Sequence, residues 1–262
     1  RAVAAGVETV GDVELFARAI HALNTRREHP MRVIAITGSN GKSTVTAMCG
    51  DMCRMAGLTT CVAGNIGLPV LDALYEIEQG LAPAPQVWVL ELSSFQLETT
   101  SSLNADAATM LNLSEDHIDR HGTMVNYARI KERLVAGVQK DGTAVIGVDD
   151  DWCQAIADRV EQAGRHVVRI SVRHPLSDGL YAEGERLVEV STAAKIEIAR
   201  LGGIGSLRGL HNAQNAACAS AAVRALGLAP DVIQKGLRSF PGLAHRMEQV
   251  GRRGNVLFVN DS

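Results

Sequence analysis

A short polar run between two apolar segments carries the most specific chemistry in the chain. The run is Thr37-Gly38-Ser39-Asn40-Gly41-Lys42-Ser43-Thr44, between a predicted strand at 32–37 and a predicted helix at 42–56. Glycines let successive backbone N–H groups turn toward one anion, and a helix N-terminus adds partial positive charge. Lys42 is then placed to reach the β- and γ-phosphates of a nucleotide, and Ser43 or Thr44 to ligate Mg²⁺. The run therefore predicts a phosphate-binding loop.

The spacing within this loop departs from the general pattern of such loops. In GxxxxGK[ST] the first glycine would fall at Ile36, whereas this chain has GxxGKST. The departure argues against an ordinary GTPase or small-molecule kinase. A glycine turn that precedes a helix by accident is the competing interpretation, and the GK[ST] triplet between a strand and a helix disfavours it.

Acidic and histidine side chains follow later predicted strands. Glu91 ends the predicted strand 86–92, where α/β sheets place ligand sites, so it could hold Mg²⁺ or orient water. A solvated strand end is the alternative. His117 and its neighbouring carboxylates in the polar loop 114–122 could meet a second metal. His117 and His121 also form an HxxxH spacing, but a zinc site would need a third ligand in register.

Several downstream residues are weaker candidates when each is taken alone. Lys131 lies on a predicted helix at 124–137, where a lysine is most often a surface residue. Asn212 and Asn215 open a predicted helix at 209–227, share a face and could contact a base edge or a phosphate. Helix capping is the alternative for this pair. Arg246 suits phosphate or carboxylate recognition but carries little weight as a single arginine.

These residues need a scaffold in which strands and helices alternate. Runs rich in β-branched and apolar residues predict strands at 32–37, 58–63, 86–92, 106–111, 143–148 and 166–171. Further helices are predicted after Pro69, from Asp150 and at 230–239, with β-like segments at 172–205, 246–250 and 255–259. The alternation predicts an α/β fold with a mainly parallel sheet flanked by helices.

Composition narrows the possible partners and the compartment. Over 262 residues the formal charge is −3, and only 2 Trp, 3 Tyr and 4 Phe are present, so neither a strong positive field nor stacking platforms for nucleic acid are expected. No apolar run reaches the ~18–20 residues of a membrane span. The five cysteines are odd in number and form no CxxC pair, which predicts buried free thiols in a reducing cytoplasm.

Taken together, the motifs resemble those of the Mur ligase family, the ATP-dependent amide ligases of peptidoglycan precursor synthesis. The matching segments follow family order: TGSNGKST at 37–44, GNIG at 64–67, ELSSFQLETT at 91–100, NLSEDHIDRH at 112–121, Lys131, HNAQN at 211–215, HR at 245–246 and NDS at 260–262. Within the family, ELSSFQLE is typical of the branch that adds D-glutamate to UDP-N-acetylmuramoyl-L-alanine. Other Mur-type or folylpolyglutamate-type amide ligases, and a nucleotide-binding module without ligase chemistry, are the alternatives.

The resemblance implies a mechanism through an acyl phosphate and a role for each matched residue. The nucleotide is expected at Gly38, Ser39, Asn40, Gly41, Lys42, Ser43, Thr44, Asn212, Asn215, Arg246 and Asp261, the last at the ribose. Two Mg²⁺ ions are expected, one at Ser43, Thr44 and Glu91 and one near His117, with Lys131 carbamylated beside the metals. Substrate contacts are expected at Asn65, Ser93, Ser94 and His117.

The resemblance also implies a domain organisation. Residues 1–30 are expected to be the end of an N-terminal UDP-binding domain with its linker, and 31–262 a P-loop NTPase-like central ATP-binding domain. A C-terminal domain would lie outside this chain, so the chain alone is expected not to ligate D-glutamate. The enzyme is expected to be a cytoplasmic monomer that uses small-molecule substrates, without nucleic-acid or membrane partners.

Overall fold

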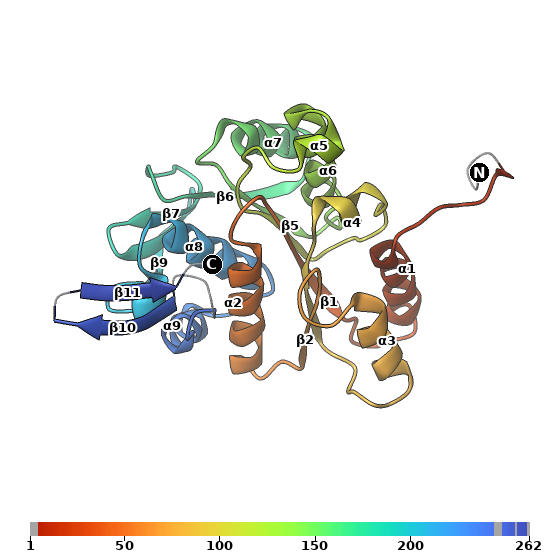
Figure 1. The fold of residues 1–262 in the computed structure, drawn as a ribbon, viewed down its shortest axis with the longest axis horizontal. Helices are drawn as coiled ribbons and strands as arrows, with labels where there is room; N and C mark the ends of the chain where they lie inside the picture. Colours follow the sequence, from red (N-terminus) through yellow and green to blue (C-terminus); the bar gives the residue numbers. More distant parts are fainter. Residues whose placement is uncertain (1–4, 244–247, 255, 261–262) are drawn as a thin grey trace.

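A long, mainly parallel sheet forms the centre of the molecule (Figure 1). The computed structural model describes residues 5–243, 248–254 and 256–260. In this part of the chain one sheet has the strand order β2-β3-β1-β4-β5-β6-β7-β8-β9, parallel from β2 to β7 and antiparallel from β7 to β9. Its strands are β1 Arg32–Thr37, β2 Thr60–Gly64, β3 Val87–Glu91, β4 Ala107–Met110, β5 Thr143–Gly147, β6 His166–Ser171, β7 Gly179–Glu183, β8 Arg186–Val190 and β9 Lys195–Arg200.

Helices cover both faces of this sheet. They are α1 Asp12–Asn24, α2 Lys42–Met55, α3 Val70–Glu78, α4 Ser94–Glu98, α5 Ile118–His121, α6 Met124–Ala136, α7 Asp151–Gln162, α8 Leu210–Ala225 and α9 Pro230–Ser239, with a 3₁₀ turn η2 at Gly205–Leu207. Figure 1 shows α2, α8 and α9 on one side of the sheet and α1 and α3 on the other. The fold class predicted from the alternation of strands and helices is therefore confirmed.

The continuous apolar character of the central strands follows from burial on both faces. In β1, Val33 and Ala35 point into the core beneath α1, α3, α6 and α7, whereas Ile34 and Ile36 point into the core beneath α2, α8 and α9. Successive side chains of a strand alternate between faces, so each face receives every second residue. A strand buried in this way reads as an unbroken apolar run, which made β1 and β3 easy to predict.

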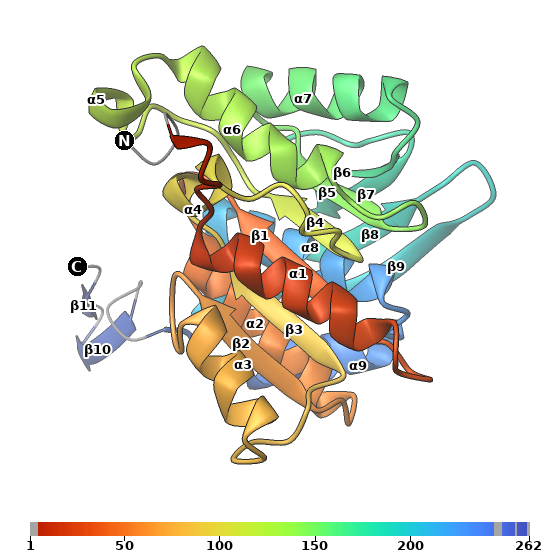
Figure 2. The ribbon, with the colours of Figure 1, turned by 90° about the vertical axis from the view of Figure 1, so that its right-hand side faces the viewer.

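Helix α1 is part of the same core and not a loosely attached tail. Its residues Val13, Phe16 and Ile20 are buried, and the Phe16 ring meets Trp88 of β3 edge-on at 4.8 Å between centroids. Figure 2 shows α1 lying across the sheet above β3. The packing therefore does not break at residue 30, where the sequence predicts a domain boundary, and the assignment of residues 1–30 to a preceding domain stays a prediction.

The carboxyl ends of three neighbouring strands bring the sequence motifs together. Strand β1 lies between β3 and β4, with Ile36 opposite Glu91 and Thr37 opposite Met110. The phosphate loop, Glu91 and the polar loop after β4 therefore start from the same edge of the sheet. This is the edge at which open α/β sheets bind their ligands.

The chain also contains a separate hairpin, β10 Glu248–Arg253 with β11 Val256–Asn260. Of the segments 246–250 and 255–259 predicted as strand-like, residues 248–250 and 256–259 are strands, and 246, 247 and 255 lie outside the described residues. No helix in the described part of the chain combines the length and apolar character that a membrane crossing requires.

Candidate active site

The phosphate loop adopts a conformation that requires glycine at two positions. Gly38 has φ +151° and Gly41, which precedes α2, has φ +86°. A Cβ built on Gly41 would stand 2.2 Å from Asn215 Oδ1, so this glycine also makes room for α8. Glycine is the residue that adopts such backbone angles without steric cost. The prediction of a tight glycine loop before a helix is confirmed.

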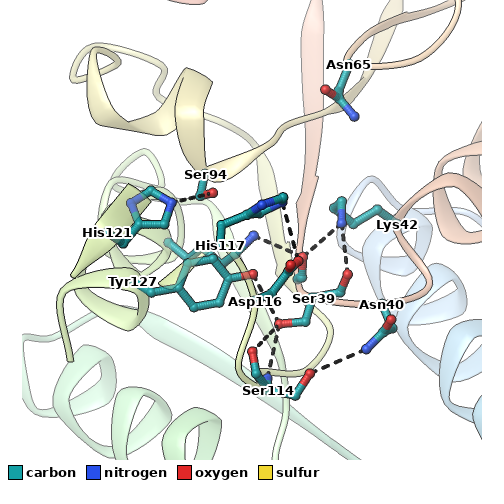
Figure 3. Close-up of polar contacts among 12 residues, drawn as sticks. Ser39, Asn40, Lys42, Asn65, Ser94, Ser114, Asp116, His117, His121 and Tyr127 are labelled. Carbon is teal, nitrogen blue, oxygen red and sulfur yellow. Dashed lines mark hydrogen bonds and ion pairs between the residues drawn. The ribbon is translucent and has the colours of Figure 1, made fainter. Parts of the chain in front are cut away.

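The loop after β4 braces the phosphate loop from the side. The backbone N–H of Ser39 donates to Asn112 O at 2.9 Å, and that of Asn40 donates to Asn112 Oδ1 at 2.9 Å. Ser39 Oγ lies 3.1 Å from Tyr127 Oη and accepts from the Ser114 N–H at 3.0 Å, as Figure 3 shows. Asn112 and Ser114 belong to the segment 112–121 that the resemblance selected, whereas Tyr127 was not predicted, because it acts only through its contact with Ser39.

Two lysines converge on one backbone carbonyl of the phosphate loop. Lys42 Nζ donates to Gly38 O at 3.1 Å and to Ser39 O at 3.0 Å. Lys131 Nζ donates to the same Gly38 O at 2.9 Å and to Thr37 Oγ1 at 3.1 Å. Lys131 is only 1% exposed, so its interpretation as a surface residue, drawn from its position alone, is wrong. The Lys42 ammonium beside the loop suits a polyphosphate, and Lys131 brings a second amine to the same carbonyl.

The burial of Lys131 changes its acid–base behaviour. Loss of solvent and, to a lesser degree, the positive charge of Lys42 lower the pKa of Lys131 from 10.5 to about 7. Both effects penalise the ammonium form relative to the neutral amine. A lysine of this kind is partly neutral near physiological pH and can therefore react as a nucleophile, which an ordinary lysine does rarely.

Glu91 presents a buried carboxylate oxygen that no protein donor satisfies. The side chain is 2% exposed, and its Oε1 accepts from Asn65 Nδ2 at 3.1 Å. Its Oε2 is buried without a hydrogen-bond partner. An unsatisfied buried acceptor is costly, and carboxylate oxygens are preferred ligands of Mg²⁺. The residues present therefore fit a divalent cation at this edge of the sheet.

His117 is held in a strained backbone conformation at the start of α5. It has φ +52° and is the only residue other than glycine with positive φ in the described part of the chain. Its side chain is 48% exposed, with Nε2 at 3.5 Å from Asp116 Oδ2 (Figure 3). Such strain persists where surrounding structure over-determines it, often at functional sites. His121 does not join His117 in a shared site, because its ring contacts Ser94 instead.

The two serines after Glu91 use their hydroxyl groups within the protein. Ser93 caps α4: its Oγ accepts from the Gln96 N–H at 3.3 Å, and the Gln96 side chain accepts from the Ser93 N–H in return. Ser94 is 2% exposed, and its Oγ lies 2.9 Å from His121 Nε2. Both hydroxyls thus have structural partners, and the predicted contact of these serines with substrate stays a prediction.

A cavity of about 260 Å³ opens beside the phosphate loop and contains both predicted asparagines. Asn212 Nδ2 donates to Arg208 O at 3.1 Å, and Asn215 Nδ2 donates to Asn212 Oδ1 at 3.4 Å. The remaining lining residues are Asn40, Gly41, Thr44, Asn112, Ser206, His211, Gln214, Phe240, Gly242 and Leu243. The sequence could not single out Ser206, Phe240 or Leu243, because common turn and apolar residues carry no motif. Arg246 and Asp261 lie outside the described residues.

A larger cavity, of about 500 Å³, lies at the opposite edge of the sheet. It is bounded by the end of α1, the starts of β1 and β4, and the loop after α6, and it contains none of the predicted site residues. The carboxyl-end site is therefore identified by its chemistry and not by its size.

A strand, a glycine loop, a helix and two converging lysines define a phosphate-binding α/β domain of the P-loop type. Comparison with known proteins specifies the family further. The family model of the Mur ligase middle domain matches residues 36–223, and the chain belongs to the Mur ligase family.

Curated relatives and solved structures agree with this assignment. The chain is 56% identical over 262 residues to the UDP-N-acetylmuramoylalanine–D-glutamate ligase of Bradyrhizobium diazoefficiens, with 98% of this chain and 53% of the relative covered. It thus spans about half the length of the curated relatives it matches. MurF from Acinetobacter baumannii is 22% identical with a TM-score of 0.72, over 94% of this chain and 54% of that one. MurF ligase from Thermotoga maritima in complex with ADP is 16% identical with a TM-score of 0.68, over 97% of this chain and 58% of that one. These two likenesses establish the fold.

Proposed function

We propose that the chain is the ATP-handling part of an amide ligase that joins D-glutamate to UDP-N-acetylmuramoyl-L-alanine in peptidoglycan precursor synthesis. The observation that carries the proposal is the convergence of Lys42 and Lys131 on Gly38 O, near the buried, unsatisfied oxygen of Glu91. A nucleotide switch would need the phosphate loop and Lys42, but it would not need the buried side chains of Lys131 and Glu91. The names of the relatives supply the choice of substrates.

ATP would lie with its phosphates on the loop 38–44 and its nucleoside in the adjoining cavity. The N–H groups at the start of α2 and the Lys42 ammonium would neutralise the phosphates. Asn212 and Asn215 line the cavity, and we assign Arg246 and Asp261 to the same nucleotide, with Asp261 at the ribose. The fold shared with a Mur ligase solved in complex with ADP supports this placement.

Mg²⁺ would be held by Ser43, Thr44 and Glu91, and a second ion by His117 and a modified Lys131. When bound, these ions neutralise charge on the phosphate oxygens. Ser43 and Thr44 lie in the first turn of α2, and Glu91 Oε2 has no competing protein donor. Phosphate oxygens and water commonly complete such coordination, so a protein cage is not required.

We propose that Lys131 carries a carbamate. The neutral amine would attack the carbon of CO₂ and lose one proton, leaving a negatively charged carbamate beside Gly38. The lowered pKa of Lys131, about 7, supplies the neutral amine that this addition needs. Protein equilibrated with ¹³C-bicarbonate is expected to show a carbamate carbonyl resonance that the variant Lys131→Met lacks. The same spectrum in both proteins would contradict the modification.

The reaction would proceed in two displacement steps. The substrate carboxylate attacks the γ-phosphorus and ADP leaves, which gives an acyl phosphate. The neutral amine of D-glutamate then attacks the acyl carbon to give a tetrahedral intermediate, from which inorganic phosphate leaves and the nitrogen loses one proton to form the amide. In the first step Lys42 would stabilise charge on the transferring phosphoryl group, while Asn65 and His117, at the mouth of the site, would orient the substrate.

The remainder of the protein would complete the working enzyme. We assign residues 1–30 to the end of a UDP-binding domain and its linker, and 31–262 to the central domain. D-glutamate would bind with the help of a segment outside this chain. All five cysteines are free, which suits a reducing cytoplasm, and we place the enzyme in that compartment. We propose that the enzyme is a monomer.

Phosphate release by the full-length protein tests the proposal. Release from ATP is expected to require both UDP-N-acetylmuramoyl-L-alanine and D-glutamate, with L-glutamate inactive. Stimulation by a folate and L-glutamate would favour a folylpolyglutamate-type ligase. Nucleotide binding without release under any substrate pair would favour a binding module. The Lys42→Ala variant serves as the inactive control, because it loses the phosphate-binding ammonium.

A further inference from the structure

His121 is a buried histidine for which the proposed chemistry has no use. Its side chain is 0% exposed; Nε2 forms a hydrogen bond with Ser94 Oγ at 2.9 Å, whereas Nδ1 lies 3.2 Å from Glu98 Oε1 without forming a hydrogen bond. The ring stacks on Phe95 at 5.6 Å and lies 5.3 Å from the Tyr127 ring. Ser94, Phe95 and Glu98 all belong to α4, so one side chain of α5 contacts three residues of one short helix.

Helix α4 is so short that its position depends on contacts with neighbouring elements. It has five residues, and the ends of a helix leave backbone groups unsatisfied. Ser93 and Gln96 satisfy its first turn, and Arg133 of α6 donates to Leu97 O at 3.3 Å and Glu98 O at 3.0 Å. His121 contacts the side of α4 through Ser94 and Phe95. The contacts from α5 and α6 therefore determine where α4 lies.

The position of α4 matters because the segments on its two sides carry different residues of the site. Helix α4 begins three residues after Glu91, whereas the other side carries His117 at the start of α5 and Lys131 in α6. Phe95 extends the contact, since its ring lies 4.9 Å from the His117 ring. Figure 3 shows the His121–Ser94 pair on the far side of His117 from Lys42 and Asn40 of the phosphate loop. His121 thus connects the two segments without facing the nucleotide.

We propose that His121 is a positioning residue: through its hydrogen bond to Ser94 it fixes His117 and Lys131 relative to Glu91, and so sets the affinity for the divalent cation at this site. The inference rests on the proposed function for the role of that cation. A histidine that only fills space would be replaced by a ring of similar size at little cost to cation binding. The hydrogen-bonding nitrogen is what the proposal requires.

The test compares three variants of the full-length protein. His121→Phe keeps the ring and the stacking but removes both nitrogens, and His121→Gln keeps a group that can bond Ser94. His166→Phe is a control for the loss of a histidine–hydroxyl contact alone, because the exposed His166 contacts Thr143 Oγ1 through Nδ1 at 3.2 Å, at the start of strand β6. Each variant is first checked for an unchanged circular dichroism spectrum.

Two measurements follow. The Mg²⁺ concentration for half-maximal phosphate release is expected to rise about 10-fold in His121→Phe, the range found when groups behind metal ligands are removed. The KM for ATP is expected to stay unchanged, and His121→Gln to recover part of the loss. Binding of Mn²⁺ in the presence of a non-hydrolysable ATP analogue, followed by electron paramagnetic resonance, is expected to weaken to the same extent.

An unchanged cation requirement and unchanged Mn²⁺ binding in His121→Phe would overturn the inference, even if its melting temperature falls. A shift of equal size in His166→Phe would overturn it too. If His121→Phe does not fold, Ser94→Ala removes the same contact from the other side and is expected to shift the cation requirement in the same direction. Failure of the wild type to release phosphate would instead refute the proposed function, and the Mn²⁺ measurement would still decide the inference.

Discussion

A lysine placed among apolar residues is a cost that the fold must offset. Lys131 is 1% exposed, and its pKa falls from 10.5 to about 7. A shift of this size corresponds to about 5 kcal/mol against the buried ammonium. The penalty remains although the amine donates to Gly38 O and Thr37 Oγ1. A methionine of similar volume would avoid the cost, so the lysine is retained at the expense of stability.

The first prediction at this scale is that Lys131→Met stabilises the protein in a pH-dependent way. Because the folded pKa is the lower one, the unfolded chain binds more protons between about pH 7 and 10.5, and wild-type stability rises with pH in that window. The gain in melting temperature of Lys131→Met is therefore expected to be largest at pH 7 and to shrink toward pH 10. Thermal unfolding of both proteins across this range measures it, and a gain independent of pH would contradict the burial argument.

At the scale of elements, a buried carboxylate attaches α1 to the segment that follows α4. Glu14 is 2% exposed and accepts from the N–H groups of Ser101 and Ser102 at 2.8 and 3.0 Å, from Ser102 Oγ at 2.9 Å and from Arg18 Nε at 2.9 Å. Burial by itself would raise the pKa of Glu14, but these hydrogen bonds outweigh it and lower the pKa from 4.5 to about 2. Helix α1 is thereby attached to the segment that leads into the start of β4, at the edge of the sheet opposite the site.

We expect Glu14→Gln to lower the free energy of unfolding by about 3 kcal/mol at pH 7, which is the value of the pKa shift. Because the folded pKa is depressed, this stabilisation is present above pH 4.5 and is lost as the pH falls from 4.5 toward 2. The difference between the variant and the wild type should therefore vanish at the acid end. Urea unfolding at several pH values measures it.

Glu8→Gln serves as the control for this prediction, because Glu8 pairs with the same Arg18 at the surface and is expected to change stability little. A difference between Glu14→Gln and the wild type that is equal at pH 7 and pH 2.5 would show that the carboxylate charge is not involved.

The sequence predicts those elements whose local signals are strong and misses those defined by contacts. Gly38, Gly41 and Lys42 identify the phosphate loop because a turn that cradles an anion needs glycines and a lysine in this order, and the apolar run of β1 is long. Helices α4 and α5 have five and four residues, too few for a helical period to show. The burial of Lys131 is equally hidden, since it depends on Tyr127 and Thr37 closing around it.

At the scale of the whole molecule, the strand order explains why distant motifs form one site. Strand β1 pairs with β3 on one side and β4 on the other, so the loops that carry Glu91 and His117 flank the phosphate loop. The antiparallel strands β8 and β9 extend the sheet away from this centre. Parallel pairing between segments far apart in sequence requires crossover helices, and these same helices supply Lys42 and Lys131.

The packing of α8 on α2 has a consequence for the growing chain. Cys49 Sγ of α2 contacts Ala219 O of α8, 170 residues further along the sequence. At ~5–20 residues per second, a ribosome adds that stretch in roughly 10–30 s. Until that stretch has been added, α2 lacks the cover that α8 provides, and Gly41 lacks its neighbour Asn215. A segment made late in synthesis thus completes the surroundings of a loop made early.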